Sequence, residues 1–363
     1  MASQSFVSQF KALVPRYQVH TRRFEDLTSH LPRLEAHLLR MGRVPLSLHP
    51  AWLSVLQKAQ KHEAYCLEVT QEGNTRGFLA LAHVRSLLFG RFLVSLPYVN
   101  YGGVVAEDDA AAELLIDHAV RLADELKVRY LELRHEQPLA HAALTASRSD
   151  KLHMRLALPA SSPELWDCLA GKVRNQVRKG QKSGLTVLWG KNELLPEFYA
   201  VFSENMRDLG TPVFGRRLFA SILDHFPHRA EFCVIRAQGQ PAAAALVLHG
   251  WGITEVPSAS SLRAHNHTCA NMLLYWELLK RAVERKQQSF DFGRSSQDSS
   301  THRFKKQWGP KSFPAEWQYY LRSGNVDALR TENPRYQRFI KLWQRLPLGL
   351  SRLIGPRIVR GIP

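Results

Sequence analysis

Cysteine is scarce in this sequence, and the few cysteines lie far apart. The 363 residues include only four, and no two of them form a CxxC pair. This spacing argues against a disulfide framework and against a cysteine-based zinc site, and we predict no bound metal. We interpret Cys66, Cys168, Cys233 and Cys269 as reduced core residues, because their surroundings are apolar or helical.

Long apolar runs are lacking as well. The apolar stretches are short or, near Arg91, interrupted by charge, and residues 1–20 contain no run of signal-peptide length. A membrane-spanning helix needs about 20 mostly apolar residues, and a secretory signal needs about 7–15 in its apolar region. The sequence therefore predicts a cytoplasmic protein.

Acidic residues are outnumbered by basic ones. The chain has 32 Asp and Glu against 49 Lys and Arg, which gives a formal net charge of +17. An excess of this size favours an anionic partner, either nucleic acid, a phosphate-bearing co-substrate or an acidic membrane surface. A basic surface that serves only solubility is the alternative.

The order of strand-like and helix-like segments repeats along the chain. In each half a hairpin precedes a strand, a loop, an amphipathic helix and a second buried strand. Pro97 to Tyr130 and Pro257 to Phe290 both span 33 positions (130 − 97 and 290 − 257). The repeat predicts an α/β (α+β) fold made of a duplicated unit.

The last segment, residues 336–363, is basic and amphipathic. It contains no acid, and Tyr336, Phe339, Ile340 and Trp343 fall on one helical face. Two interpretations stay open: a segment at a membrane surface, or a C-terminal helix packed on the body. The cations are Arg338, Lys341, Arg345, Arg352, Arg357 and Arg360.

A second basic segment, GKVRNQVRKGQKSG, carries five cations within residues 172–182 and no carboxylate. On a helix, such a stripe can bind a row of phosphates, or it can be a solvated face. The missing acids favour anion binding. The five residues are Lys172, Arg174, Arg178, Lys179 and Lys182.

Loops at the ends of strands supply further candidates. Tyr98, Asn100 and Tyr101 precede two glycines, which let a ligand approach the backbone closely. Glu255 lies on a strand and is a candidate general base or an exposed alternate residue. Further binding candidates, at the end of this strand and at the start of the next helix, are Ser258, Ser260 and Asn271.

The segment SFDFGRSSQDSSTHRFKKQWG, residues 289–309, combines a buried strand, a glycine turn and clustered cations. This combination is typical of a site that holds a negatively charged donor or leaving group. Its candidates are Asp291, Arg294, Ser295, Arg303, Phe304, Lys305 and Trp308.

Three motifs carry a family resemblance: LPYVNYGG, KVRNQVRKGQKSGL and FDFGRSSQDSSTHRFKKQWG. In this order they resemble the FemAB-related proteins of the GNAT superfamily, most closely the branch associated with exosortase/PEP-CTERM exopolysaccharide systems. The resemblance extends from about Tyr17 to the end. It implies two tandem GNAT-like halves, residues 1–158 and 159–330, followed by a basic helical tail, residues 331–363.

The resemblance also implies residue roles. The family's Phe-Lys pair falls on Phe304 and Lys305, and its Asp-Phe-Gly strand end on 291–293. We therefore take Lys305, Glu255 and Asp291 as catalytic candidates. The donor- or substrate-binding candidates are Tyr98, Asn100, Tyr101, Lys172, Arg174, Arg178, Lys179, Ser258, Ser260, Asn271, Arg294, Ser295, Arg303, Phe304 and Trp308.

The implied activity is transfer of an acyl or aminoacyl group to an amino group of an envelope or exopolysaccharide precursor. No cofactor is expected to stay bound; the donor is acyl-CoA or aminoacyl-tRNA, and the acceptor an amino sugar or a peptide. Residues 263–271 lack the glycines of an ordinary acetyl-CoA loop, which weakens acetyl-CoA as donor. The alternatives are a CoA-dependent N-acyltransferase and a non-catalytic basic adaptor for RNA or membrane.

Overall fold

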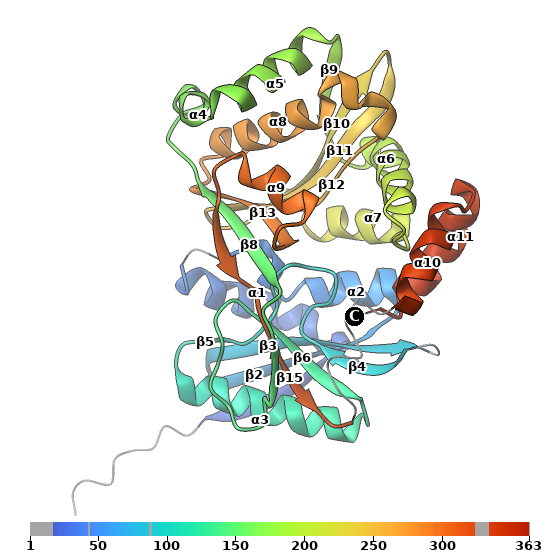
Figure 1. Ribbon diagram of the computed structural model, residues 1–363. Helices are drawn as coiled ribbons and strands as arrows, with labels where there is room; N and C mark the ends of the chain where they lie inside the picture. The colour runs from blue at the N-terminus through green and yellow to red at the C-terminus, as the bar shows by residue number, and fades with distance from the viewer. Residues whose placement is uncertain (1–16, 43, 87–88, 324–333, 363) are drawn as a thin grey trace, which may run out of the picture.

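The computed structural model describes residues 17–42, 44–86, 89–323 and 334–362. It contains two mixed β-sheets, one in each half of an elongated molecule, with helices on both faces of each sheet (Figure 1). This is the predicted α/β fold of two related halves, followed by a helical tail.

The first sheet has its strands in the order β1-β2-β3-β4-β6-β15-β7, and β5 pairs with β3. Along β2, Cys66 faces the core that contains α1 and α2, whereas Leu67 faces the core that contains α3. Because successive strand residues point to opposite faces, this unbroken apolar strand fits burial on both sides. The elements are β1 (Gln18–Arg23), α1 (Phe24–Arg40), α2 (Trp52–Gln60), β2 (Glu63–Gln71), β3 (Asn74–Ser86), β4 (Gly90–Val94), β5 (Val105–Ala106), α3 (Asp109–Glu125), β6 (Tyr130–His135), β7 (Ala146–Arg148) and β15 (Glu316–Leu321).

The second sheet runs in the order β14-β8-β13-β12-β11-β10-β9. Helices α6 and α7 cover one face and share a core with α2 of the first half, while α4, α5 and α8 cover the other. The elements are β8 (Lys151–Ala157), α4 (Ser162–Cys168), α5 (Gly171–Lys182), β9 (Leu185–Gly190), α6 (Leu195–Asp208), α7 (Arg216–His225), β10 (Ala230–Ala237), β11 (Gln240–His249), β12 (Ile253–Ser261), α8 (Ala270–Glu284), β13 (Ser289–Ser296), α9 (Ser300–Lys306) and β14 (Lys311–Pro314).

The predicted duplication is confirmed by the one parallel strand pair that each sheet contains. In the first half, β4 pairs with β6 and Leu93 lies opposite Leu131. In the second half, β12 pairs with β13 and Thr254 lies opposite Phe290. A helix, α3 or α8, connects the two strands of each parallel pair. The equal spacing in the sequence therefore reflects two copies of the same crossover unit.

Two strands do not follow a division of the chain at residue 158. Strand β8 ends at Ala157 but pairs with β13 and β14 in the second sheet. Strand β15 comes from the end of the second half and pairs with β6 and β7 in the first sheet. In Figure 1, β8 and the chain leading to β15 cross between the halves. Each sheet is therefore completed by a segment from the other side of the predicted boundary.

The tail forms two helices, α10 (Pro334–Gln344) and α11 (Leu348–Val359), and they pack against the body beside α6. Trp343 is buried, and Arg352 Nε donates a hydrogen bond of 2.8 Å to Ser203 Oγ. Body packing, one of the two interpretations of this segment, is therefore confirmed. On the predicted apolar face, Phe339 packs on Trp343 with ring centroids 5.5 Å apart, although Phe339 itself is 39% exposed. The side chain of Tyr336 lies outside the described part.

Within the described ranges, no helix combines the length and the apolar character that crossing a membrane requires.

Two glycines of α11 give a test of the tail packing. A Cβ on Gly355 would lie 2.9 Å from both Val213 N and Val213 Cγ1, whereas a Cβ on Gly349 would meet no atom within 4 Å. We expect Gly355→Ala to destabilise the protein by about 1–3 kcal/mol, because the backbone of residue 213 blocks the added methyl.

The matched control is Gly349→Ala, which should stabilise the helix by about 0.5–1 kcal/mol because alanine loses less backbone entropy. Urea unfolding of both variants provides the measurement. Equal effects of the two changes would contradict the packing of α11.

Candidate functional site

The candidate site lies where β12 and β13 stop pairing. Their parallel register ends at Glu255 and Asp291, although β12 continues to Ser261 and β13 to Ser296. Beyond this point β12 pairs only with β11, and β13 only with β8. The two strands therefore diverge after this point.

A loop of the first half reaches this divergence. Gly293 has a φ of +74°, and a Cβ on it would lie 3.0 Å from Asn100 Nδ2 and 3.5 Å from Val256 O. Glycine is needed here both for the left-handed backbone and for the close approach of the Asn100 amide. The structure thus brings the predicted residue Asn100 next to the predicted strand end at 291–293.

The corresponding position in the first half is closed. After β4 ends, Gly102 forms a bridge with Arg134, and Ser95 N donates a hydrogen bond of 2.9 Å to Glu132 O. Backbone groups of the 95–102 loop therefore occupy the place beside β6. Only the second half keeps its two strands apart without such a bridge in the described residues.

Asp291 joins three parts of the chain. Its carboxylate accepts hydrogen bonds from the Tyr101 hydroxyl, from Arg155 Nε at 3.2 Å and from Gly293 N at 2.6 Å. The Arg155 guanidinium also lies over the Tyr101 ring, with Cζ 4.9 Å from the centroid. Asp291 is fully buried, so this predicted catalytic residue orients its neighbours and has no solvent-facing oxygen.

Glu255, the predicted base, is also fully buried. Its carboxylate accepts hydrogen bonds from Ser47 N, at 2.9 Å, and from the Ser47 hydroxyl. Burial raises the pKa of Glu255 to about 7, and the nearby charge of Asp291 adds to the rise against the opposing effect of the Ser47 hydrogen bonds. A pKa near 7 suits a general base, but both Glu255 and its partner Ser47 are buried.

Lys305 lies on α9 beside the junction of the two halves. We call this junction the seam; it is where Arg294 of the second half and Arg134 of the first half lie over Trp317. The residue is 5% exposed, and Nζ donates a hydrogen bond of 2.9 Å to Arg294 O. Burial lowers the pKa of Lys305 to about 8, and repulsion from Arg294 contributes, while the charge of Asp291 opposes the fall. The ammonium makes no ion pair with the described residues.

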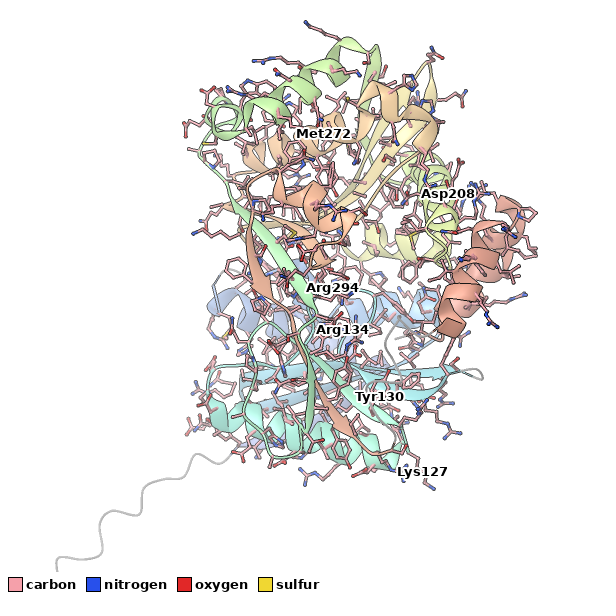
Figure 2. The ribbon with its side chains drawn as sticks, in the orientation of Figure 1. Lys127, Tyr130, Arg134, Asp208, Met272 and Arg294 are labelled. Atoms are coloured by element: carbon pink, nitrogen blue, oxygen red, sulfur yellow. The ribbon has the colours of Figure 1, made fainter. Side chains whose placement is uncertain are left out.

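Arg294 and Arg134 share one aromatic ring. Their guanidinium carbons lie 4.5 Å and 4.3 Å from the centroid of Trp317, which belongs to β15. Figure 2 labels both arginines at the junction of the two halves. Arg134 is neutralised by Glu132 at 2.7 Å, but Arg294 makes no ion pair in the described part of the chain. The seam therefore holds two unneutralised cations, Arg294 and Lys305.

Burial lowers the pKa of Arg294 to about 9, and the neighbouring charge of Arg134 contributes to this fall. A guanidinium in this position favours the binding of an anion, because the anion replaces the stabilisation that the buried charge loses when it leaves water. Ser295, which follows on the same strand, is buried, and its hydroxyl has no hydrogen-bond partner among the described atoms.

The other predicted residues on the second half lie around this site in different settings. Ser258 is partly exposed on the β12 arm, and Ser260 Oγ accepts a hydrogen bond of 3.1 Å from Asn205. Phe304 and Trp308 pack on Tyr275 of α8, with centroid distances of 4.9 and 6.1 Å. Asn271 lies in the first turn of α8.

Two predicted residues point elsewhere. The Tyr98 hydroxyl contacts His62 Nε2 at 2.8 Å and donates to Arg360 O at 3.0 Å, so Tyr98 faces the tail. Arg303 is exposed, and its Nη1 donates to Asp298 O at 2.7 Å. Neither side chain shares a contact with Lys305 or Asp291.

The basic stripe lies on the outer side of α5. Val173, Val177 and Gly180 form its buried face, and a Cβ on Gly180 would lie 3.2 Å from Cys269 O at the start of α8. Lys172 and Lys179 are exposed and make no ion pair in the described ranges, whereas Arg174 lies 3.9 Å from Asp167 and Arg178 lies over Trp166. The first turns of α8 therefore contact both α5 and the α9 residue Phe304.

Sequence reasoning missed four residues of the seam: Ser47, Arg134, Arg155 and Trp317. All four contact the site across long sequence separations, so no local pattern revealed them. The sequence offered one signal for Arg134, because it is a charged residue at the end of a buried strand. In the described part of the chain, no group of three or more His, Cys, Asp or Glu side chains could hold a metal ion.

Comparison with known proteins identifies the fold. Residues 170–306 match the acetyltransferase (GNAT) domain family, and no curated protein matches the sequence. A crystal structure of FemX is similar with a TM-score of 0.62 and 15% identity, over 90% of this chain and 100% of that one. The C-terminal domain of a putative lysylphosphatidylglycerol synthetase from Agrobacterium fabrum has a TM-score of 0.56 and 13% identity, over 83% and 94%.

A third similar structure is a tandem GNAT protein from the clavulanic acid biosynthesis pathway. Its TM-score is 0.52 at 15% identity, over 85% of this chain and 100% of that one. Together with the two parallel crossover units, these similarities show that the chain has a tandem GNAT-like fold. At this level of identity they establish the fold, with the GNAT domain in the second half.

The buried carboxyl group of Glu255 predicts a pH effect on stability. In the folded protein it stays protonated up to about pH 7, whereas in the unfolded chain it ionises near pH 4–5. Stability from this group is therefore present at pH 4 and is lost as the pH rises to 7. Between pH 5 and 8, wild type should lose on the order of 3 kcal/mol relative to Glu255→Gln.

Urea unfolding of both proteins at several pH values measures this difference. Glu113→Gln, which removes an exposed carboxylate from α3, is the matched control. A constant difference between wild type and Glu255→Gln across this range would show that Glu255 is ionised in the folded protein.

Proposed function

We propose that this protein is an acyl- or aminoacyltransferase of FemAB type. It transfers the group to an amine of a cell-envelope or exopolysaccharide precursor. One observation carries the proposal: the divergence of β12 and β13 in the GNAT-type half holds Lys305 and Arg294, two cations without a carboxylate partner in the described residues. The FemX and lysylphosphatidylglycerol synthetase structures support this choice at the level of fold.

The chemistry requires charge stabilisation more than covalent catalysis. The amine attacks the carbonyl carbon of an ester or thioester, a C–N bond forms, and the C–O or C–S bond to the donor breaks. Negative charge develops on the carbonyl oxygen and then on the leaving group, while the attacking amine loses a proton to solvent. With its pKa lowered to about 8, Lys305 is mainly charged at pH 7 and can donate a hydrogen bond to either oxygen or pass a proton to the leaving group.

The donor is an anionic acyl carrier that binds near the start of α8. Residues 263–268 form a 3₁₀ turn, and Cys269 has a φ of +58°, so no glycine-rich loop precedes this helix. Helix α5 packs on the same helix through its buried face and carries its cations on the outer side. These cations favour a long polyanion, which supports aminoacyl-tRNA. Acyl-CoA is the alternative donor. We place the reaction in the cytoplasm, at the inner face of the membrane where envelope precursors are displayed.

Removing the Lys305 ammonium tests the catalytic assignment. Lys305→Ala should lower kcat by about 100- to 1000-fold, because one charged donor to the developing oxyanion is lost. The matched control is Lys306→Ala, since Lys306 is the next residue of α9 but is exposed. Single-turnover assays with each donor, together with thermal unfolding, separate catalysis from folding. Full activity of Lys305→Ala would remove this residue from the mechanism.

The identity of the donor is tested by titrating the protein with acyl-CoA and with aminoacyl-tRNA at several salt concentrations. We expect tighter binding of tRNA, weakening as salt rises. The double variant Lys172→Glu/Lys179→Glu should reduce the slope of log K against log salt by about 1.5, because two phosphate contacts are lost. Arg121→Glu/Lys127→Glu on the first half makes the same change of charge and should leave the slope unchanged. Tight CoA binding that salt does not affect would instead identify a CoA-dependent enzyme.

A further inference from the structure

A basic groove lies outside the β12–β13 site, where three distant segments meet. It encloses about 370 Å³ and is lined by the end of α2, the start of α7 and the end of α11. In Figure 1, α2 and α7 lie beside the tail, on the side of the molecule where α10 and α11 are drawn. The cations of the lining are Lys61, Arg216, Arg217, Arg357 and Arg360.

The groove carries positive charge that the protein does not neutralise. Its lining contains no Asp or Glu, and within the described ranges none of the five cations makes an ion pair. Only Arg216 has a ring contact, over Tyr199 at 5.1 Å. Five cations collected from three segments repel one another unless an anion joins them. The groove is therefore suited to a phosphate group.

Contacts between the segments support the groove. Tyr98 from the first half donates a hydrogen bond through its hydroxyl group to Arg360 O and also contacts His62, which follows Lys61. On the other side, Gly355 packs against Val213 just before α7. The tail is thus held to both halves, and the segments that carry the cations are joined to one another.

The outward face of α11 continues the groove with apolar side chains. Leu350, Leu353, Arg357 and Arg360 recur at helical spacing on one side, whereas Ser351, Gly355 and Val359 on the opposite side are buried. Leu350 is 42% exposed and Leu353 63%. One surface of the helix therefore changes from leucines to arginines over about two turns and ends at the groove.

We propose that the outward face of α11 and the basic groove together form a docking site for an anionic phospholipid surface. The two leucines insert among the acyl chains at the interface, and the groove binds a lipid phosphate. This combination of exposed leucines and unpaired cations is what an interfacial helix needs, and residues 336–363 contain no acid that would oppose it. RNA or a soluble phosphate would not explain the exposed leucines.

This inference extends the membrane location in the proposed function, but its test involves no catalysis. The full-length protein is sedimented with vesicles of phosphatidylcholine alone, or with 30 mol% (about one third) phosphatidylglycerol added, at ~0.15 M salt. We expect binding only to the anionic vesicles. Failure to bind them would overturn this proposal and leave turnover with soluble substrates as a separate question.

Two double variants test the two parts of the surface. Arg217→Glu/Arg357→Glu changes cations from two of the segments and should weaken vesicle binding at least about 20-fold, since each cation near an anionic surface contributes about fivefold. Leu350→Ser/Leu353→Ser should weaken it at least about tenfold, because less apolar area enters the interface. Both pairs are exposed, so thermal unfolding should remain close to wild type.

The matched control is Arg121→Glu/Lys127→Glu, which makes the same change of charge on the first half. Figure 2 shows Lys127 at the end of the molecule away from α11. Equal loss of binding in this control would show that overall charge causes the effect, and it would overturn the proposal of a specific site.

Competition experiments distinguish the other occupants. Inorganic pyrophosphate at matched ionic strength should displace the protein only partly, because it cannot replace the leucine contacts. Complete displacement, with wild-type binding by the leucine variant, would mean that the groove takes a soluble phosphate. RNA binding that depends on Arg217 and Arg357 without vesicle binding, or self-association that depends on the leucines, would each overturn the proposal.

Discussion

The buried carboxylate of Asp291 is the interaction on which the site depends. It accepts hydrogen bonds from Tyr101 of the first half, from Arg155 of β8 and from the backbone at Gly293. A carboxylate without access to water is stable only while such donors remain in place, and losing one partner of a buried pair commonly costs several kcal/mol. Asp291 therefore forces the loop around Tyr101, strand β8 and the turn after β13 to keep one arrangement. Glu255 and Ser47 make a second connection of this kind one strand away.

The return of β15 to the first sheet creates the other half of the seam. This strand places Trp317 between Arg134, at the end of β6, and Arg294, at the end of β13. An aromatic face attracts both guanidinium groups and lets them approach more closely than their charges alone would permit. Glu132 neutralises Arg134, whereas Arg294, beside Lys305, makes no ion pair in the part of the chain that the structure describes.

The sequence was sufficient for the parts of this fold that repeat locally. Helical and strand periodicity, with the two equal intervals ending at Tyr130 and Phe290, predicted both crossover units and the order of their elements. It did not reveal that β15 joins the first sheet, because strand pairing between residues far apart leaves no periodic signal. The chain around the basic segment forms two helices, α4 and α5, since Leu169 and Ala170 adopt extended backbone angles between them.

The candidate site was predictable to the same extent. Asp291, Lys305 and Arg294 were predicted together because they lie close to one another in the sequence. Arg155, Trp317 and Ser47 were missed because only tertiary contacts bring them to the seam. Tyr98 was grouped with Asn100 and Tyr101 by proximity, but its φ of +73° turns it toward His62 and the tail. Neighbouring residues in a loop with left-handed positions need not face the same site.

The two halves have diverged at the position where each crossover unit can open. In the first half, the Gly102–Arg134 bridge and the Ser95 hydrogen bond fill the place beside β6 with protein backbone. In the second half, the β12 and β13 arms have no such bridge in the described residues, and the Asn100 amide lies where they separate. A closed copy can tolerate the desolvation of Tyr101 and Arg134 because their partners are fixed, whereas in the open copy Arg294 and Lys305 make no ion pair with any residue that the structure describes. The two crossover units therefore differ in their electrostatics: the first is closed by its own backbone, whereas the second keeps two buried cations that make no ion pair with the described residues.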